Sequence, residues 1–104
     1  MSDRRAFIKG LIANLILKER IETTEARAKA IRPEVEKLIS IGRHPSLASL
    51  RLLLSRIHSK KVAEKLYYEI APRYKDRAGG YTRILKTSHV RKRDGVRTAR
   101  IEFV

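Results

Sequence analysis

The residues best suited to chemistry in this sequence are cations and tyrosines that alternate towards its C-terminal end. The cations of this C-terminal block are Arg73, Lys75, Arg77, Arg83 and Lys86, with Tyr74 and Tyr81 between them. Arginine offers a planar fork of N–H donors that matches phosphate oxygens, and an exposed tyrosine ring can stack on an unpaired base. The block therefore predicts contact with a nucleic acid, although Tyr81, at the start of an expected strand, fits the core equally well. The Gly79-Gly80 pair predicts a turn with positive φ, whose amides could also hold a phosphate.

Further candidate contacts lie in three other segments. Around an expected third helix they are Arg43, His44, Arg51, Arg56, Lys60 and Lys61, with His58 as another donor; the hairpin tip adds Arg91, Lys92 and Arg93, and the N-terminal segment adds Arg4, Arg5 and Lys9. Three like charges on one hairpin tip repel one another unless an anion lies nearby. A solvated basic surface is the alternative for each segment taken alone. This alternative is less favoured for the whole chain, because the excess of Lys and Arg over Asp and Glu extends over several separate segments.

The balance of charge calls for a polyanionic partner. The 104 residues include 25 Lys and Arg against 11 Asp and Glu, which gives a formal net charge of +14. Between Arg73 and Arg100 ten Lys and Arg face only Asp76 and Asp94, and no acid occurs between Arg43 and Lys61. Such a field attracts nucleic acid or another extended anion.

Metal binding and catalysis lack suitable residues. His44, His58 and His89 are scattered, the chain has no cysteine, and no acidic cluster supplies further ligands. The acids are interspersed with bases, where ion pairing explains them. We therefore expect no enzymatic activity, no metal, no cofactor and no small-molecule substrate. The absence of cysteine also excludes a disulfide framework, as suits a reducing cytoplasm.

The hydrophobic pattern of the first half predicts a helix, a short strand and a second helix. Phe7, Ile8, Leu11, Ile12, Leu15 and Ile16 recur at spacings of three and four, which predicts one core stripe. Residues 20–23 alternate as in a half-buried strand. Thr23 or Thr24 can cap a helix that runs to Ile41, within which Pro33 predicts a kink or the true start. Gly42 is a candidate left-handed terminator.

The second half predicts two more helices and a hairpin. Ser46 can cap a third helix, and Ser59 opens a fourth that Pro72 should end. Strands are expected from Tyr81 to about Val90 and again from Val96. The fourth helix is expected to bury Val62, Ala63, Leu66, Tyr67 and Ile70. Leu47, Leu50, Leu54 and Ile57 should share one face of the third helix, and Ala99, Ile101 and Phe103 should face one way in the last strand.

The element order predicts an α+β fold of two layers. The order is helix, strand, three helices and a two-strand hairpin, with no repeat or linker, so residues 1–104 should form a single domain. We expect a small sheet packed on helices through one face, with the other face free to meet a partner. The pattern leaves the strand order open.

Two other functions fit part of this pattern. Short helices with basic surfaces suit duplex DNA, as in a nucleoid-associated or other DNA-binding protein. The first helix could lie on an anionic membrane, but we expect its apolar stripe to be needed for the core. The run from Phe7 to Leu17 is interrupted by Lys9 and Asn14 and lacks a cleavage site, and no apolar run approaches the ~20 residues that cross a bilayer. We therefore expect no membrane partner.

Two sequence blocks resemble the bacterial large-subunit ribosomal protein seventeen family. One is Glu19-Arg20-Ile21-Glu22-Thr23-Thr24, and the other runs from Arg73-Tyr74 to Arg77 and through Gly79-Gly80-Tyr81-Thr82-Arg83-Ile84-Leu85-Lys86. Lys37-Leu38-Ile39, Ile70-Ala71-Pro72 and Arg100-Ile101-Glu102-Phe103-Val104 extend the likeness over nearly the whole chain.

The resemblance implies a ribonucleoprotein component that acts in translation, in the cytoplasm and on the ribosome. It implies binding to large-subunit ribosomal RNA near the outer end of the peptide exit tunnel, support of assembly, and contact with neighbouring ribosomal proteins. Members of the family usually carry a very basic N-terminal arm, whereas this sequence begins Met1-Ser2-Asp3. Either it is a short natural variant or an upstream segment is missing from it, so contacts of that arm are not transferred.

Overall fold

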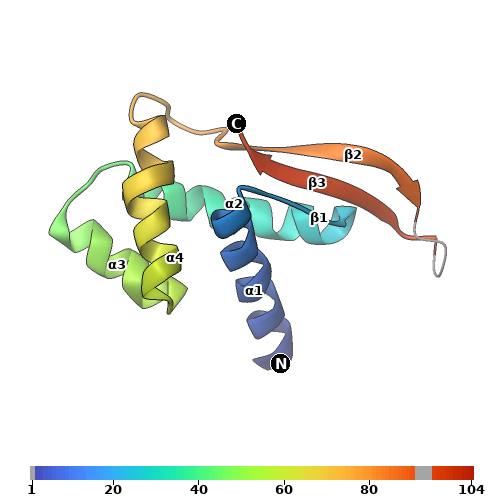
Figure 1. Cartoon of the computed structure of the whole chain (residues 1–104), viewed down its shortest axis with the longest axis horizontal. Coiled ribbons are helices and arrows are strands. Elements are labelled where there is room, and N and C mark those ends of the chain that lie inside the picture. The colour runs from blue at the N-terminus through green and yellow to red at the C-terminus, as the bar shows by residue number, and fades with distance from the viewer. Residues whose placement is uncertain (1, 91–94) are drawn as a thin grey trace.

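Helices and strands follow one another in the expected order. The computed structural model describes the backbone of residues 2–90 and 95–104 and the side chains of residues 5–87 and 95–104. The elements are α1 (Ser2–Lys18), β1 (Arg20–Thr24), α2 (Glu25–Gly42), α3 (Leu47–Ile57), α4 (Lys60–Lys65), the π-helical turn η1 (Leu66–Ile70), the 3-10 turn η2 (Ala71–Tyr74), β2 (Thr82–Val90) and β3 (Arg97–Phe103). Figure 1 shows α2 running beneath the sheet, with α1 projecting from it and α3 and α4 at one end. The predicted α+β class is confirmed.

The last strand of the chain is the centre of the sheet. The strand order is β1-β3-β2, and both pairs are antiparallel. Ile101 of β3 lies between Ile21 of β1 and Ile84 of β2. Because successive side chains alternate between faces, Ala99, Ile101 and Phe103 face one way, as predicted; that way is towards α2, and all three are buried. One helix-covered face is therefore confirmed (Figure 1).

Side-chain hydroxyls begin the helices at the predicted positions. Thr24 Oγ1 accepts a hydrogen bond from the Arg27 amide at 3.2 Å, and Ser59 Oγ accepts one from the Val62 amide at 3.4 Å. Ser46 and Ser49 cap each other's amides at 2.9 and 3.0 Å. These bonds satisfy N–H groups that the first turn of a helix leaves unpaired, so each helix has a defined start.

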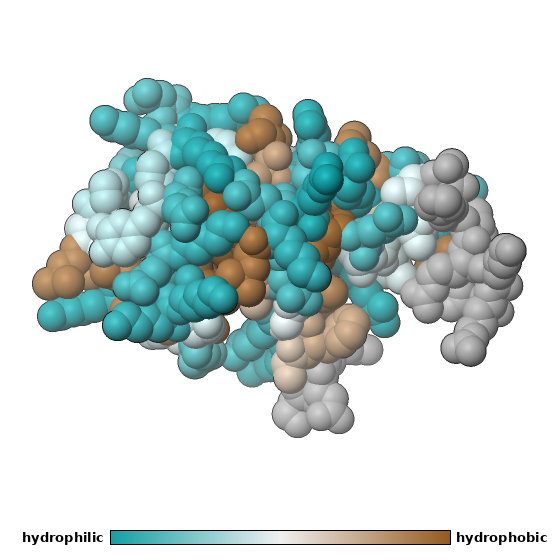
Figure 2. Space-filling view, viewed as in Figure 1, coloured by the Kyte–Doolittle hydropathy of each residue, from teal (hydrophilic) through white to brown (hydrophobic). Residues whose placement is uncertain are grey.

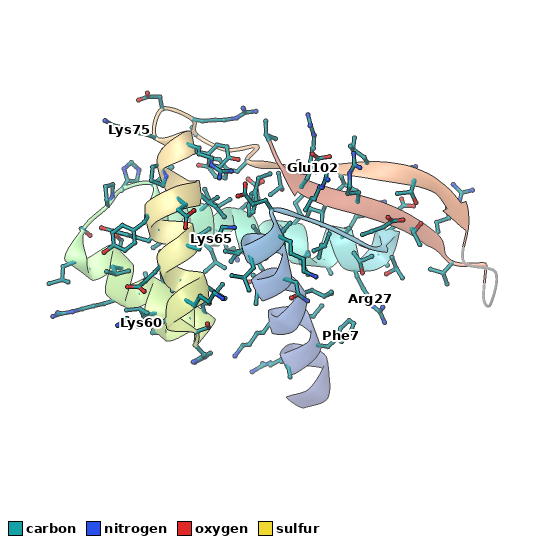
Figure 3. All side chains as sticks on the ribbon, viewed as in Figure 1. Phe7, Arg27, Lys60, Lys65, Lys75 and Glu102 are labelled. Atoms are coloured by element: carbon teal, nitrogen blue, oxygen red, sulfur yellow. The ribbon has the colours of Figure 1, made fainter. Side chains whose placement is uncertain are left out.

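The core stripe of α1 is shorter than predicted. Ile12, Leu15 and Ile16 are buried, but Phe7 is 48% exposed. The first turns of α1 project beyond the sheet and α2, so no second layer covers Phe7 (Figure 1). Its ring instead carries the guanidinium of Arg27, whose Cζ lies 4.5 Å from the ring centroid (Figure 3).

The buried face of α3 is also rotated from the predicted one. Leu53 is fully buried and Ser49 nearly so, whereas Leu47 is 64% exposed. Leu50, Leu54 and Ile57 are half-buried. Because most of the residues from Leu47 to Ile57 are apolar, the sequence pattern does not define which row faces the body, and packing selects the row through Leu53.

Gly42 and Pro72 have different roles from the predicted ones. Gly42 is the last residue of α2 and has no positive φ; it is buried where a Cβ atom would lie 3.0 Å from the Cβ of Ala71. Pro72 does not end the fourth helix, which widens into η1 and tightens into η2. Pro72 lies in the first turn of η2, where a backbone N–H is not required, so the chain continues to Tyr74. Pro33 lies within α2, exposed, and is not its start.

The close approach at Gly42 predicts a position-dependent response to a larger side chain. Gly42→Leu should lower stability by about 1 to 3 kcal/mol, because the added atoms collide with Ala71 and Leu53. Gly10→Leu is the matched control: no atom lies within 4 Å of its Cβ position, so helix propensity should raise stability by about 0.8 kcal/mol. Chemical denaturation measures both, and equal effects would contradict the packing argument.

Candidate nucleic-acid interface

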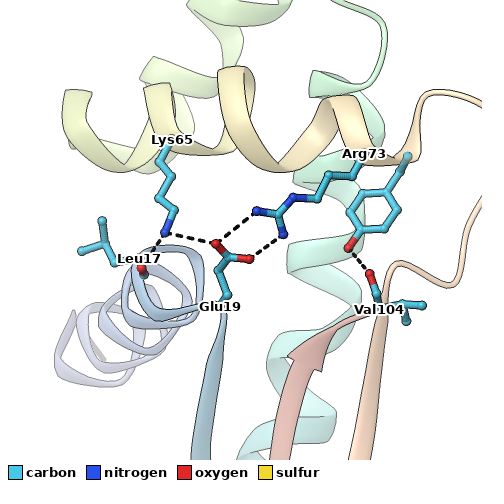
Figure 4. A network of polar contacts seen from close by, with 6 residues as sticks. Leu17, Glu19, Lys65, Arg73 and Val104 are labelled. Carbon is cyan, nitrogen blue, oxygen red and sulfur yellow. Dashed lines mark hydrogen bonds and ion pairs between the residues drawn. The ribbon is translucent and has the colours of Figure 1, made fainter.

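Most of the C-terminal block is bonded into the fold. Tyr74 is 2% exposed and Tyr81 is 1% exposed, and their ring centroids lie 5.2 Å apart in the core. The prediction that Tyr74 stacks on a base is therefore wrong, and Tyr81 takes the core alternative. The Tyr74 hydroxyl donates to the backbone oxygen of Val104 at 2.7 Å, and burial raises the pKa of this phenol (Figure 4).

Arg73 is held by a carboxylate from the other end of the chain. Its guanidinium donates to both oxygens of Glu19, at 2.5 and 3.1 Å (Figure 4). Lys65 Nζ lies 3.5 Å from the same carboxylate and donates to the Leu17 carbonyl oxygen at 2.6 Å. The hydrogen bond from Arg73 lowers the pKa of Glu19 below its ordinary value of 4.5. Arg73 thus joins η2 to the start of β1, and both of its terminal guanidinium nitrogens are already bonded within the protein.

The glycine turn is enclosed by nearby arginines. Gly79 and Gly80 both have positive φ, 155° and 65°, as predicted. Arg77 Nε donates to the Gly79 carbonyl oxygen at 3.1 Å, while the Arg77 carbonyl accepts from Arg43 Nη1 and, at 3.1 Å, from the Tyr81 hydroxyl. Arg43 and Arg77 therefore stabilise this turn, which leaves less of each guanidinium for an outside anion.

Glu36 is a structural residue that the sequence analysis missed. Its carboxylate, on α2, accepts from the Tyr81 amide at 3.3 Å and from the amide and hydroxyl of Thr82 at 2.9 and 2.8 Å. These three bonds fix the first residues of β2 against α2. No local motif marks Glu36, because its partners lie 45 and 46 positions further along the chain.

The uncovered face of the sheet carries charges of both signs. Glu102 lies on β3 between Arg20 of β1 and Arg83 of β2 (Figure 3). Arg83 and Arg100 donate to it at 3.4 and 3.2 Å. On the face towards α2, Lys86 lies 3.9 Å from Glu25. Arg83 and Lys86 remain exposed, but each forms an ion pair with a nearby acid, which partly neutralises its charge.

Unpaired cations gather instead along the helices. Arg5 and Lys9 of α1 and Arg56 of α3 line a groove together with Lys37 of α2. None of these four forms an ion pair within the part of the chain that the structure describes. Among the other predicted contacts, His44, Arg51, Lys60, Lys61 and Lys75 are exposed and make no ion pair with described residues. Figure 2 shows hydrophilic side chains over most of the visible face.

Lys37 is the groove residue that the sequence analysis did not select. Ala30, Glu34 and Lys37 are spaced by four and three, so they share one row of α2 beside the buried row of Ile31, Val35 and Leu38. The spacing could therefore have placed Lys37 on this exposed row from the sequence alone. The predicted contacts Arg4, Arg91, Lys92 and Arg93 lie outside the described side chains.

The described residues offer neither a metal site nor a membrane-spanning helix. The described residues include no group of three or more His, Cys, Asp or Glu placed to hold a metal ion. No helix among them combines the length and apolar character needed to cross a membrane.

Comparison with known proteins identifies the family. The model of the family described as Ribosomal protein L17 matches residues 7–104. The chain belongs to the ribosomal protein L17 family. The prediction made from the two sequence blocks is thereby confirmed, and with it the expectation that this is a ribosomal protein and not an enzyme.

Relatives within the L17 family match over most of their length. The large ribosomal subunit protein bL17 of Gemmatimonas aurantiaca is 48% identical over 101 residues, which cover 97% of this chain and 85% of the relative. The bL17 proteins of Thermodesulfovibrio yellowstonii and Shouchella clausii are 44% and 46% identical; 99% of this chain is covered in each case, with 77% and 92% of the relative. The chain is therefore similar to nearly complete L17 proteins.

The bonds of Glu19 predict a pH-dependent contribution to stability. Glu19→Gln should lower stability by about 1 kcal/mol at pH 7, a modest value because the side chain is 37% exposed. Since the pKa of Glu19 is depressed in the fold, the wild-type advantage should be complete above pH 4.5 and should disappear as the pH falls through the lower folded value. Thermal melting between pH 3 and 7 measures this difference.

The matched control for this experiment is Glu69→Gln. Glu69 is exposed and forms no ion pair with any described residue, so its replacement should leave the melting curve nearly unchanged. A Glu19→Gln protein that melts like the control at every pH would show that the network contributes nothing.

Proposed function

We propose that this chain is a structural component of the large ribosomal subunit that binds its ribosomal RNA near the peptide exit tunnel and supports subunit assembly. The observation that carries the proposal is the match of residues 7–104 to the L17 family. The net charge of +14 supports an RNA partner, because the surface field favours a polyanion. The protein would act in the cytoplasm, on the ribosome.

Recognition would depend on phosphates and shape. The major groove of A-form RNA is too deep and narrow for side chains to read, so cations from several elements would contact the backbone. Segments of RNA that are distant in its sequence could then be held together by one small protein, which is how it would support assembly. The proposed RNA contacts are Arg4, Arg5, Lys9, His44, Arg51, Arg56, Lys60, Lys61, Lys75, Arg83, Lys86, Arg91, Lys92 and Arg93.

Arg43, Arg73 and Arg77 would contribute differently. Their donors are bonded to Arg77 O, Glu19 and Gly79 O, so they chiefly stabilise the surface that carries the free cations. The uncovered face of the sheet, where Arg83 and Arg100 surround Glu102, carries charges of both signs and would also suit a neighbouring ribosomal protein beside the RNA.

The proposal predicts that the chain sediments with the large subunit. Lysate expressing the tagged chain should show it in the large-subunit fractions of a sucrose gradient, and it should remain there in high salt, because an integrated protein makes many simultaneous contacts. An equally basic unrelated protein controls for adsorption. Recovery only at the top of the gradient would contradict the proposal.

The DNA-binding alternative predicts a different order of affinities. At physiological salt the protein should bind a folded large-subunit RNA fragment more tightly than duplex DNA of matched length, because only the RNA presents the required shape. With ~6 to 10 phosphate contacts, affinity should fall by about 10³ to 10⁵ between 50 and 200 mM salt. Filter binding measures both, and equal affinities would favour the alternative.

A further inference from the structure

One groove of the molecule combines cations from three helices. It lies between α1, α2 and the end of α3 and has a volume of about 680 Å³. Among the described side chains, its charged and titratable lining consists of Arg5, Lys9, Lys37, Arg56, His58 and one acid, Glu34. Figure 3 shows Phe7 and Arg27 on the opposite flank of α1 from Lys60, so the cation–π contact lies on one side of α1 and the other side is left for α3 and α4.

The charge of this groove differs from that of other hollows in the described surface. The hollow beside α4 is lined by Lys60, Lys61 and Lys65 but also by Glu64 and Glu69. The hollow between α2 and β2 holds three cations against Glu25 and Glu36. In the α1–α2–α3 groove four Lys and Arg face a single acid. It is therefore the most positive of the three.

The cations of the groove have no acid of the described chain to neutralise them. Glu34 is three residues before Lys37 on α2, yet the two form no ion pair. Like charges that face one another across a concave surface repel, and low-dielectric walls strengthen their field. An anion in the groove would relieve this repulsion and gain several charge-assisted hydrogen bonds.

The groove also has an apolar lining beside its charged side chains. Ile12 and Leu38 contribute to the lining, but the domain core already buries them to 9% and 8% exposure. Ile8 and Ile57 are half-buried, and Ala13 and Ala30 are small. The accessible lining is more apolar than polar, so the four cations lie in low-dielectric surroundings, which strengthen their field. Their charge thus favours an anionic partner for this groove.

We propose that this groove holds the phosphate backbone of one RNA strand, with Lys9, Lys37 and Arg56 in direct contact with phosphate oxygens. The inference rests on the proposed function and makes it more specific. It moves the main RNA contact from the C-terminal block, where acids share the charge, to the helical side of the domain. A phosphate backbone fits because it supplies repeated anions along an extended path, which a groove lined from three helices can follow.

The first test removes equal charge from the groove and from elsewhere on the surface. The groove variant is Lys9→Gln, Lys37→Gln and Arg56→Gln; the matched variant is Lys18→Gln, Arg20→Gln and Lys29→Gln, three exposed cations that are neither in the groove nor among the proposed RNA contacts. With a folded large-subunit RNA fragment, the groove variant should reduce the slope of log affinity against log salt by about 2 to 3, as expected when three phosphate contacts are lost. The matched variant should change the slope by less than half as much. Thermal melting of each variant confirms that it is folded.

The second test adds a charge without removing any contact. Ala30→Glu places a carboxylate in the groove, whereas Ala48→Glu places one on an exposed position of α3 outside it. The first should weaken RNA binding by about tenfold and the second by less than twofold, because salt screens charges beyond about 8 Å. Both substitutions replace an exposed helical alanine, so a failure to fold is not expected of either.

The outcomes separate this inference from the proposed function. If wild type binds the RNA but the two triple variants lose equal slope, or Ala30→Glu matches Ala48→Glu, the groove assignment is wrong and the proposed function stands. If poly-glutamate displaces RNA from wild type at equal charge concentration, the groove selects an acidic protein segment and the assignment is again overturned. If wild type does not bind the RNA, the proposed function fails as well.

Discussion

Glu19 occupies the single residue between α1 and β1, and the arrangement of the helices depends on the bonds that it makes there. Its φ of 68° is unfavourable for a side chain larger than glycine, so the turn needs compensating contacts. Arg73 and Lys65 bind its carboxylate, its amide donates to the Leu15 carbonyl at 2.6 Å, and its carbonyl accepts from Phe103 at 3.2 Å. One residue thereby connects α1, α4, η2 and β3. These bonds hold the point where α1 meets the sheet, and the earlier turns of α1 form one side of the groove.

The cations of the domain fall into two classes with different roles. Arg73, Arg77 and Arg43 are bonded to acceptors within the fold, whereas Lys9, Lys37 and Arg56 have no described partner. Both classes look alike in the sequence, because each consists of cations interspersed with apolar residues. The two blocks that resemble the L17 family meet in space through Glu19 and Arg73, so part of that likeness reflects how the domain is held together and not how it contacts RNA.

Local features of the fold could be predicted from sequence, and non-local ones could not. The caps at Thr24, Ser46 and Ser59 and the alternation of Ala99, Ile101 and Phe103 follow from patterns a few residues long. The exposure of Phe7 and the burial of Leu53 depend on which neighbouring helices and strands reach these residues in the folded domain. The pairing of Arg73 spans 54 positions, and the burial of Tyr74 depends on contact with Tyr81. The candidate site was therefore predicted in its residue types and only partly in its location: Arg5, Lys9 and Arg56 were selected, whereas Lys37 was missed.

Acidic residues, more than basic ones, decide which surface of this domain can bind a polyanion. With 25 Lys and Arg, cations are present on almost every element, so their positions alone discriminate little. Glu25 and Glu102 form ion pairs with the sheet cations Lys86 and Arg83. Glu19 pairs with Arg73 of η2, the turn that precedes β2. Among the described side chains, the groove between α1, α2 and α3 has only one acid, Glu34, so its positive field is left for a partner. A ligand that binds only the folded form stabilises it by mass action, so filling this groove would also relieve the repulsion that opposes folding of so basic a chain. If the proposed RNA partner binds there, folding and binding are coupled through the distribution of the eleven acids.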